Sequence, residues 1–428
     1  MNTNTTDIKQ KIMKLWKDTF HDSDAYISLV FENYFDPQFV EYYEEKDQII
    51  SALIGIPYDF SNGSQKITGL YLCGLATKED FRHKGIMSEL IKRINDKARD
   101  NGFSISFLIP ASDMLRMYYQ GKGYVNAIFR VEERYTDVHD FYNDCISTLN
   151  KEEDKIREYR KRYLDELTAN ILGIEDKNER ENIAKYIQSK ERENKNYLYI
   201  CHTEKDIHAI LNENSISGGE IYYIKTKNNE IKGVAFITFD ERKRINIPKI
   251  YYDDSYAYYR LLDRIKKAPS ESPISIWRYP EEIDRFALWD KVYGAPNPAG
   301  ITGGAYGIAE RVFDVSTHSQ PYGMVKILNI SEILKFIVKD QAGLKFSILV
   351  KDENIAKEGT LFDVEGSKVV SKRISPDQMI HYNTSKGITI LTYRDLLEII
   401  FRKKDSNSLI MEAFGIPRIG LNMSLMLD

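Results

Sequence analysis

The amino-acid sequence predicts an α+β protein in which mixed sheets are flanked by helices and the chain folds into three domains. With 428 residues, the chain is longer than one hydrophobic core usually accommodates. Apolar runs of strand length alternate with amphipathic segments of helical spacing. The same order of predicted strands and helices occurs twice, at residues 39–130 and 220–294, before a third part rich in strands begins near residue 318.

Two helices and two strands are expected at the start of the chain. Residues 8–19 are amphipathic, and residues 21–24 offer caps for a second helix that ends at Asp36-Pro37. Residues 39–43 and 48–58 are predicted as strands of a meander. The aromatic and acidic side chains of the second helix either pack in the core with a solvated face or form a wall for a cationic amine. They are Asp24, Tyr26, Phe31, Glu32, Tyr34 and Phe35.

The segment Ile67–Lys97 is predicted to fold as strand, loop and helix. Its apolar run ends in a polar turn, and an amphipathic segment begins after Gly85. Gly85 has no Cβ, so the backbone can approach a ligand closely at the start of this helix. The unpaired N–H groups of a helix start, beside Arg82, His83 and Lys84, can bind an anion of the size of a pyrophosphate. Taken alone, R-x-x-G also fits a basic helix start with no ligand.

The residues that follow this helix make the pattern more specific. A second strand at Phe103–Pro110 ends in proline, a short helix carries Tyr119, and Gly123-Tyr124 precedes another strand. The order strand, R-x-x-G-x-x, helix, strand and Y-x-x-x-G-Y extends over residues 67–130. This order resembles the core of the GNAT superfamily of acyl-CoA N-acyltransferases.

The middle of the chain is predicted to repeat this plan. Residues 142–196 carry dense charge at helical spacing, which is typical of solvated helices that cover a sheet or connect domains. The loop 252–255 carries two aspartates and lacks Arg and Gly, so it would repel a pyrophosphate. We interpret this part as a second GNAT-like domain whose cofactor site has been lost. Its predicted strands are 220–225, 231–238, 245–252 and 274–277, and its predicted helices are 256–267 and 283–293.

The third part is predicted to combine antiparallel strands with two helices. Ser331 is expected to cap the first helix and Thr392 the second, and Asp352-Glu353-Asn354 is expected to form a turn. With TYRDL before its last helix, this part resembles a sterol carrier protein fold, which either holds a lipid or is a scaffold without one. The predicted strands are 324–328, 344–350, 359–364 and 368–372.

The composition excludes several classes of protein. The net charge is −4, and the 60 basic and 64 acidic residues are dispersed, so no nucleic acid is expected as a partner. The sequence has no signal-peptide core and no run of ~18 apolar residues, so no membrane association is expected. Cys73, Cys145 and Cys201 are too few and too scattered for a disulfide framework or a zinc site. We expect a cytoplasmic protein with no metal.

A GNAT domain, a degenerate GNAT domain and a sterol-carrier-like domain, in this order, resemble the enhanced intracellular survival (Eis) type of N-acetyltransferase. The resemblance covers the whole chain and implies domains at residues 1–140, 141–317 and 318–428. It implies transfer of an acetyl group from acetyl-CoA to a primary amine of a small cationic or peptide acceptor, by direct attack in a ternary complex. It also implies a homo-oligomer, which is a hexamer in this family.

The resemblance assigns residues to the acetyl-CoA site. Leu75, Ala76 and Thr77 correspond to the strand edge that pairs with pantetheine. Met87 stands where most of the superfamily has a small residue, and Eis-like loops often have a larger apolar residue there. The residues of the pyrophosphate loop are Arg82, His83, Lys84, Gly85, Ile86, Met87 and Ser88.

The resemblance also assigns the general acid. Tyr119 corresponds to this acid, because a phenol with a reference pKa of ~10 is neutral at pH 7 and can protonate a departing thiolate. Its neighbour Tyr118 is the alternative. Cys73 lies on the strand near the cofactor and is expected to be a core residue, not an acyl carrier.

The general base is harder to assign. An amine with a pKa of ~10 must lose a proton before it attacks the thioester. The strand 70–75 contains no acid, and Glu79 and Asp80 are expected to cap the helix. In Eis-like enzymes the C-terminal carboxylate reaches the N-terminal domain, which points to Asp428. The alternative for this tail is a strand that fills an interface.

Two other functions are open at this stage. One is a non-catalytic acyl-CoA or lipid-binding module, in which the third domain carries a hydrophobic ligand. The other is a tandem-GNAT aminoacyl or fatty-acyl transferase that acts on a peptide. The absence of a basic stripe speaks against peptidyl-tRNA as its substrate.

Overall fold

The computed structural model describes most of the chain and shows three connected parts. The described residues are 3–136, 139–193, 198–279, 313–315, 320–339, 343–351, 358–375, 377–378, 382, 388–401 and 421–422.

The first part has two helices, a meander and a strand–helix–strand unit, as predicted. Ser23 caps α2 by accepting a hydrogen bond from the backbone of Tyr26 (3.2 Å), and Ser112 caps α4 in the same way. The helices are α1 (Thr3–Phe20), α2 (Asp24–Tyr34), α3 (Ile86–Asp100) and α4 (Asp113–Gln120), with the 3-10 turns η1 (Pro37–Phe39) and η2 (Glu79–Phe81). The strands are β1 (Val40–Glu45), β2 (Gln48–Ser61), β3 (Lys66–Thr77), β4 (Ile105–Leu108) and β5 (Val125–Tyr135).

The middle part has the predicted hairpin, a third strand and a helix. The described helices are α5 (Phe141–Asn150), α6 (Asp154–Glu166), α7 (Lys177–Arg192), α8 (Glu204–Ile216) and α9 (Ser255–Lys266). The described strands are β6 (Thr168–Ile171), β7 (Leu198–Ile200), β8 (Glu220–Lys225), β9 (Ile231–Phe239), β10 (Arg244–Tyr252), β11 (Glu271–Arg278) and β12 (Phe313–Val315). β6 is a strand within the segment predicted as helical, because it pairs with β8 at the edge of the sheet. The helix predicted at 283–293 lies outside the described residues.

The third part has the predicted succession of strands and helices. Its elements are β13 (Gln320–Ile327), α13 (Ile330–Val338), β14 (Lys345–Lys351), β15 (Gly359–Glu365), β16 (Lys368–Ile374), β17 (Ile388–Thr392), α15 (Tyr393–Phe401) and β18 (Leu421–Asn422). Asn329 caps α13, so the prediction of Ser331 as the cap was wrong by two positions. Thr392 accepts a hydrogen bond from the backbone of Asp395 at the start of α15, as expected of a cap. The turn predicted at 352–354 lies outside the described residues.

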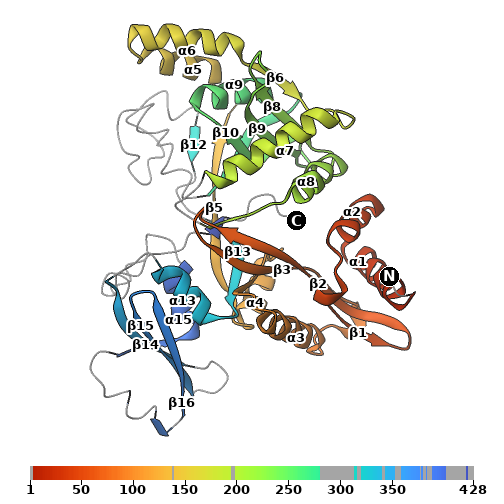
Figure 1. Cartoon of the computed structure of the whole chain (residues 1–428). Coiled ribbons are helices and arrows are strands. Elements are labelled where there is room, and N and C mark those ends of the chain that lie inside the picture. Colours follow the sequence, from red (N-terminus) through yellow and green to blue (C-terminus); the bar gives the residue numbers. More distant parts are fainter. Residues whose placement is uncertain are drawn as a thin grey trace.

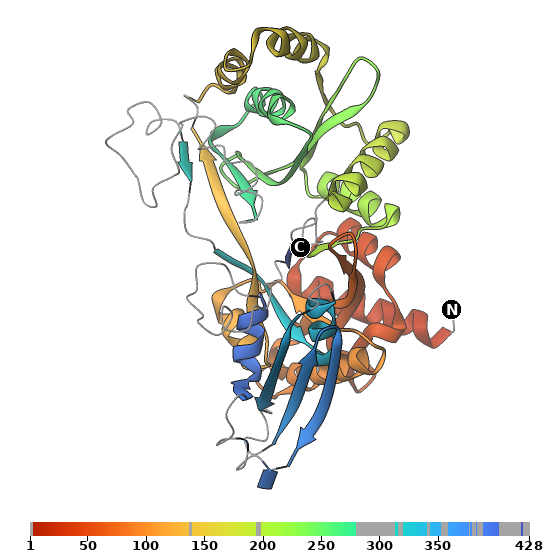
Figure 2. The same cartoon turned by 60° about the vertical axis from the view of Figure 1, so that its left-hand side comes forward.

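One long sheet joins the first two parts. Its order is β18-β7-β2-β3-β4-β13-β5-β11-β10-β9-β8-β6. Two further strands lie outside this order, β1 paired with β2 and β12 paired with β5. The strand β5 pairs with β13 in its first half and with β11 in its second half. Figures 1 and 2 show β5 running from the body that contains α3 to the body that contains α9. β13, which starts the third part in sequence, thus lies inside the sheet of the first part.

Two units of this sheet have the same local order. β3 and β4 are parallel and joined through α3, and β10 and β11 are parallel and joined through α9. A separate sheet of order β16-β15-β14-β17 belongs to the third part and packs with α13 and α15.

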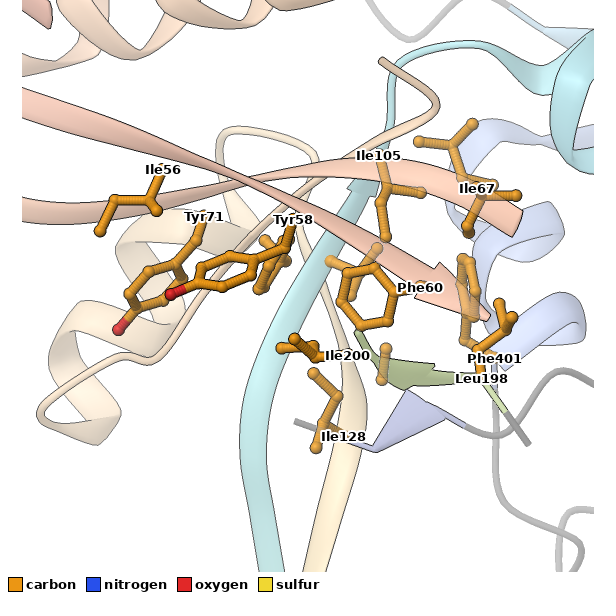
Figure 3. Packing of buried hydrophobic residues seen from close by; sticks show 14 of the residues in the cluster. Ile56, Tyr58, Phe60, Ile67, Tyr71, Ile105, Ile128, Leu198, Ile200 and Phe401 are labelled. Atoms are coloured by element: carbon orange, nitrogen blue, oxygen red, sulfur yellow. The ribbon is translucent and has the colours of Figure 1, made fainter. Parts of the chain in front are cut away.

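The first part has a hydrophobic cluster on each face of its sheet, because successive side chains of a strand point to opposite faces. Leu70 and Leu72 pack with α3, whereas Tyr71 packs with α1 and α2. The cluster on the α1 side continues into the third part, and Figure 3 shows Phe60 and Phe401 within it. None of the helices in the described ranges has both the length and the apolar character that crossing a bilayer requires.

Candidate active site

The strands β3 and β4 pair over a short stretch and then separate. Gly69–Tyr71 pairs with Ile105–Phe107, and β3 then continues to Thr77. Beyond Tyr71, β3 has no strand partner along this edge in the described part of the chain. Backbone N–H and C=O groups on such an edge can pair with an extended polar ligand.

A β-bulge bends β3 at the point where the two strands separate. Ala52 pairs with Ala76 and Ile54 pairs with Cys73, so β3 contains one extra residue between these two pairs. Gly74 lies within the bulge and has φ +60°. A Cβ at this position would overlap the ring of Trp16, so glycine lets this indole pack directly on the strand.

The end of β3 is fixed by hydrogen bonds from both sides. On β2, the hydroxyl of Ser51 donates to the carbonyl of Ala76 at 3.1 Å and lies 2.9 Å from the hydroxyl of Thr77. From the loop, Nε of Arg82 donates to the carbonyl of Thr77 at 3.2 Å. Leu75, the first residue of the predicted strand edge, lines a cavity between α1, α2, β3 and α4.

The loop after β3 has the backbone geometry of an anion site. Gly85 is the N-cap residue of α3, with φ +80° and no side-chain cap, and His83 also has a positive φ of 62°. The first N–H groups of α3, from Ile86 onward, are therefore orphan donors of a helix start. Arg82, His83 and Lys84 are exposed beside them. This arrangement suits an anionic ligand such as a pyrophosphate.

The acids before this loop do not cap α3, contrary to the prediction. Glu79 and Asp80 form the separate 3-10 turn η2, and Gly85 takes the capping position. The larger residue at Met87 packs against the hydrophobic cluster of α3. Ser88 bonds through its hydroxyl to the hydroxyl of Tyr118, 3.0 Å away, so the loop is joined to α4.

A cavity of about 510 Å³ lies between α1, α2, β3 and α4. It is lined from both faces of the sheet, because Tyr71 belongs to the cluster on the α1 side and Leu72 and Tyr119 belong to the cluster on the α3 side. The cavity thus occupies the position where β3 leaves β4. The lining residues are Trp16, Phe20, Asp22, Tyr26, Val30, Ile56, Tyr71, Leu72, Cys73, Gly74, Leu75, Ile109, Ala111, Leu115 and Tyr119.

Tyr119 lines this cavity and is 6% exposed. Burial raises the pKa of the Tyr119 phenol well above its usual value, and the neighbouring phenols of Tyr118 and Tyr124 add to the effect. The phenol is therefore protonated at neutral pH and can act as a proton donor. The hydroxyl of Tyr118 lies against Ser88 instead, so of the two tyrosines only Tyr119 is among the described residues that line the cavity.

Asp22 also lines the cavity, although the sequence pattern shows it only as one of several capping residues. It follows α1, and its Oδ2 accepts a hydrogen bond from Nε1 of Trp16 at 2.7 Å. The two acids considered for a cationic wall lie elsewhere, since Glu32 is exposed and Asp24 pairs with Lys17 at 2.7 Å. The capping sequence 21–24 contained the relevant carboxylate, but its role became visible only through the contact with Trp16.

Cys73 lines the cavity as a packed thiol. Burial raises its pKa to about 12, so the thiol carries little thiolate at neutral pH. The expectation of a core residue and not an acyl carrier agrees with this environment.

The corresponding loop of the middle part is filled by side chains of the chain itself. Asp253 pairs with Lys190 at 2.7 Å and with Lys232 at 3.3 Å, and it accepts a hydrogen bond from the hydroxyl of Tyr186 at 3.0 Å. Asp254 caps α9 by accepting from a backbone N–H of that helix. The acidic loop therefore has structural partners at the place where the first part offers free donors.

Two further predictions concern the site, namely that it holds no metal and that Asp428 takes part in it. Within the described ranges, no three His, Cys, Asp or Glu side chains gather in a way that could hold a metal ion. Asp428 lies outside the described residues. The described element nearest to it in sequence, β18, pairs with β7 in parallel, so residues 421–422 lie in the long sheet, with β7 and β2 between them and β3.

Residues 2–127 match the family model of the acetyltransferase (GNAT) domain. The first part of the chain is therefore a GNAT acetyltransferase domain, and the predicted enzyme class is confirmed at the level of this domain. No curated protein matches the sequence.

Solved structures share the fold over nearly the whole chain. A conserved protein of unknown function from Enterococcus faecalis is 10% identical, with a TM-score of 0.62 over 95% of this chain and 90% of its own. A GCN5-related N-acetyltransferase from Anabaena variabilis is 12% identical, with a TM-score of 0.62 over 97% of this chain and 96% of its own. Eis1 from Mycobacterium abscessus is 9% identical, with a TM-score of 0.59 over 95% of this chain and 90% of its own. At these identities the likeness shows the fold alone.

Proposed function

We propose that this protein is an acetyl-CoA-dependent N-acetyltransferase that transfers an acetyl group to a primary amine by direct attack in a ternary complex. One observation carries the proposal. The open edge of β3, the uncapped start of α3 at Gly85 and the buried phenol of Tyr119 all lie around the place where β3 leaves β4.

The donor would be held mainly by main-chain groups. The edge of β3 at Leu75–Thr77 would pair with the pantetheine amides, and the first N–H groups of α3 would bind the pyrophosphate. The charges of Arg82, His83 and Lys84 would add attraction at the rim of the loop. Because these donors are already in place, the loop needs little reorganisation to bind an anion.

The chemistry needs one proton to leave the amine and one to reach the sulfur. The neutral amine attacks the thioester carbonyl, a C–N bond forms, and the C–S bond breaks when the tetrahedral intermediate collapses. Tyr119 gives its proton to the departing thiolate, which makes free CoA thiol. The proton that the nitrogen loses passes to solvent, and the Tyr119 phenolate is reprotonated from solvent. Cys73, with its raised pKa, takes no part as a carrier, so the acetyl group passes directly from donor to acceptor without an acetyl-enzyme.

The acceptor amine needs a carboxylate beside the thioester carbon. Asp22 is the described carboxylate that lines the cavity, and it can hold an ammonium group by charge. The role of base that the resemblance assigns to Asp428 stays a prediction. Deletion of Leu427 and Asp428 would then abolish turnover with acetyl-CoA still bound, and full activity of the shortened protein would contradict it.

The other two parts are assigned supporting roles. We assign the middle part, with its α9-joined parallel strands and its filled acidic loop, to a second GNAT-like domain that binds no cofactor. We assign the third part to a sterol-carrier-like scaffold. Its strand β13 supports the first domain directly, because it pairs with both β4 and β5. Cytoplasmic location and a homo-oligomer remain expectations from the family resemblance.

The test is a thiol-release assay with acetyl-CoA and a panel of amines. The panel contains polyamines, aminoglycosides, arylalkylamines and peptides with a free N-terminus, and each product is identified by a mass gain of one acetyl group. We expect amine-dependent release of free CoA. If acetyl-CoA binds but no amine releases thiol, the chain is a non-catalytic acyl-CoA-binding module and the proposal is wrong.

A further inference from the structure

We infer that the acceptor is a lipophilic monoamine, in which one ammonium group is attached to an apolar aryl or alkyl body. The inference rests on the proposed function and concerns the same cavity. It specifies what the cavity selects among the many amines that an N-acetyltransferase could use.

The walls of the cavity on the side of α1 and α2 are apolar and aromatic. Trp16, Tyr26 and Val30 come from these helices, and Ile56 and Tyr71 come from β2 and β3. All five side chains are buried by their neighbours, so the walls are packed surfaces. A flat or extended apolar body would gain affinity by burying its own surface against these walls.

Charge is present at one point of this surface. Among the described residues that line the cavity, Asp22 is the one acidic residue, and none of them is Lys, Arg or His. Its Oδ2 is oriented by the hydrogen bond from Trp16, which places the carboxylate beside the indole. A single ammonium group would be held by this carboxylate and by the face of an aromatic ring.

The exposed rim of the cavity is apolar as well. Phe20 and Leu115 line the cavity and are 41% and 39% exposed, although large apolar side chains are usually buried. They come from two different helices, the end of α1 and α4. The body of an acceptor that extends outward from the thioester would therefore contact Phe20 and Leu115.

A polycation fits these walls poorly. Each further ammonium group would have to leave water for an apolar surface without a second carboxylate from the described lining, and an unpaired buried charge is costly. An aminoglycoside or spermidine would thus lose affinity with each additional charge. An arylalkylamine has a single charge and an apolar body, so its ammonium group can face Asp22 while its ring faces the aromatic wall.

The experiment compares kcat/KM for matched amines in the full-length protein with saturating acetyl-CoA. Phenethylamine and hexylamine are the lipophilic monoamines, ethylamine is the monoamine without a body, and spermidine and kanamycin are the polycations. We expect kcat/KM for phenethylamine to exceed that for spermidine and for kanamycin at least tenfold. Binding of phenethylamine is also measured by calorimetry with the Tyr119→Phe variant, so that recognition is observed independently of turnover.

Two variants separate the charge from the apolar surface. Asp22→Asn should lower kcat/KM for every amine at least tenfold with acetyl-CoA affinity unchanged. Phe20→Ala changes an exposed side chain, so it should fold normally and lower kcat/KM for phenethylamine about fivefold more than it lowers kcat/KM for ethylamine, which has no apolar body to contact Phe20. The ratio of kcat/KM between the two amines is thus the readout for the second variant.

The outcomes distinguish the inference from the proposed function. Preference for spermidine or kanamycin over phenethylamine overturns the inference and leaves the proposed function intact. Binding of phenethylamine without acetylation of any amine overturns the proposed function and keeps the recognition argument. No binding and no acetylation of phenethylamine, with other amines turned over, also overturns the inference.

Discussion

The hydroxyl groups of Ser88 and Tyr118 lie 3.0 Å apart and join the first turn of α3 to the helix that carries Tyr119. This bond connects the proposed pyrophosphate loop with the proposed general acid. The pyrophosphate loop and the general acid belong to different elements. The position of α3 relative to α4 therefore determines whether a thioester held by the loop reaches the phenol.

Substitution of Ser88 by Ala should loosen the loop against α4. A hydrogen bond of this kind contributes about 1 kcal/mol, which corresponds to roughly a fivefold change in a binding constant. We expect KM for acetyl-CoA to rise by about that factor, with kcat within twofold, in steady-state assays with varied acetyl-CoA. Ser270→Ala, on an exposed residue of the middle part, is the matched control. An unchanged KM in Ser88→Ala would show that the bond does not position the donor.

Cys73 should be dispensable for chemistry although it lines the cavity. The substitution Cys73→Ala removes a thiol whose pKa is raised to about 12, so activity should stay within a few-fold of the wild type. Mass spectrometry of the wild type with acetyl-CoA and no amine should detect no acetylated protein. A stable acetyl-enzyme that disappears in Cys73→Ala would replace direct attack by a two-step mechanism.

The chain should bind one acetyl-CoA. The first domain offers free donors at Gly85, whereas the equivalent loop of the middle part is neutralised around Asp253 by Lys190 and Lys232. Calorimetry should therefore give one site per chain. Gly85→Ala should weaken that site at least tenfold, because an alanine at φ +80° is strained and the start of α3 would have to shift to relieve the strain. A second equivalent bound by the wild type would contradict the assignment of the middle part.

Stability should decrease as pH rises above neutrality because of a buried histidine. His202 lies 2.7 Å from Oε1 of Glu191, which also accepts a hydrogen bond from Tyr251. Burial alone lowers the pKa of His202, but the Glu191 carboxylate outweighs this effect and raises the pKa above its usual value; Asp206 adds to the rise and Lys249 opposes it.

The sign of this pH dependence follows from the linkage between proton binding and folding. A raised pKa in the folded state means that the protonated His202 stabilises the fold fully below pH ~6.5, and that this contribution is lost as pH rises through the folded pKa. Wild type and His202→Gln should differ most in thermal midpoint at pH 6, by an amount equivalent to about 2 kcal/mol, and less at pH 9. A difference that grows with pH would have the wrong sign.

The local elements of the site could be predicted from the sequence because their causes are local. The helical spacing after Gly85 and the short helix with Tyr119 both appear where the pattern placed them. Periodicity and glycine positions reflect interactions between residues that are close in sequence. A strand–loop–helix unit is formed by such interactions.

The features that could not be predicted from the sequence depend on contacts between residues that are far apart in the chain. Nothing in residues 320–327 indicates that β13 lies between β4 and β5, since that pairing joins segments about 200 positions apart. Asp22 reads as one of several capping residues until Trp16 is seen to orient it into the cavity. The bulge at Gly74 likewise follows from the packing of Trp16 on β3, which the strand pattern alone does not contain.

The most direct test of the central claim is the rate of Tyr119→Phe compared with Tyr118→Phe. Each variant removes one phenol hydroxyl from α4, and Tyr119 is the one of these two residues that lines the cavity. We expect Tyr119→Phe to lower kcat by ~10²-fold or more with the acetyl-CoA affinity retained, as is usual for loss of a general acid. Tyr118→Phe should change kcat by less than about threefold and act mainly on KM for acetyl-CoA through the lost Ser88 contact. A normal kcat in Tyr119→Phe, or a larger loss of kcat in Tyr118→Phe, would contradict the proposed mechanism.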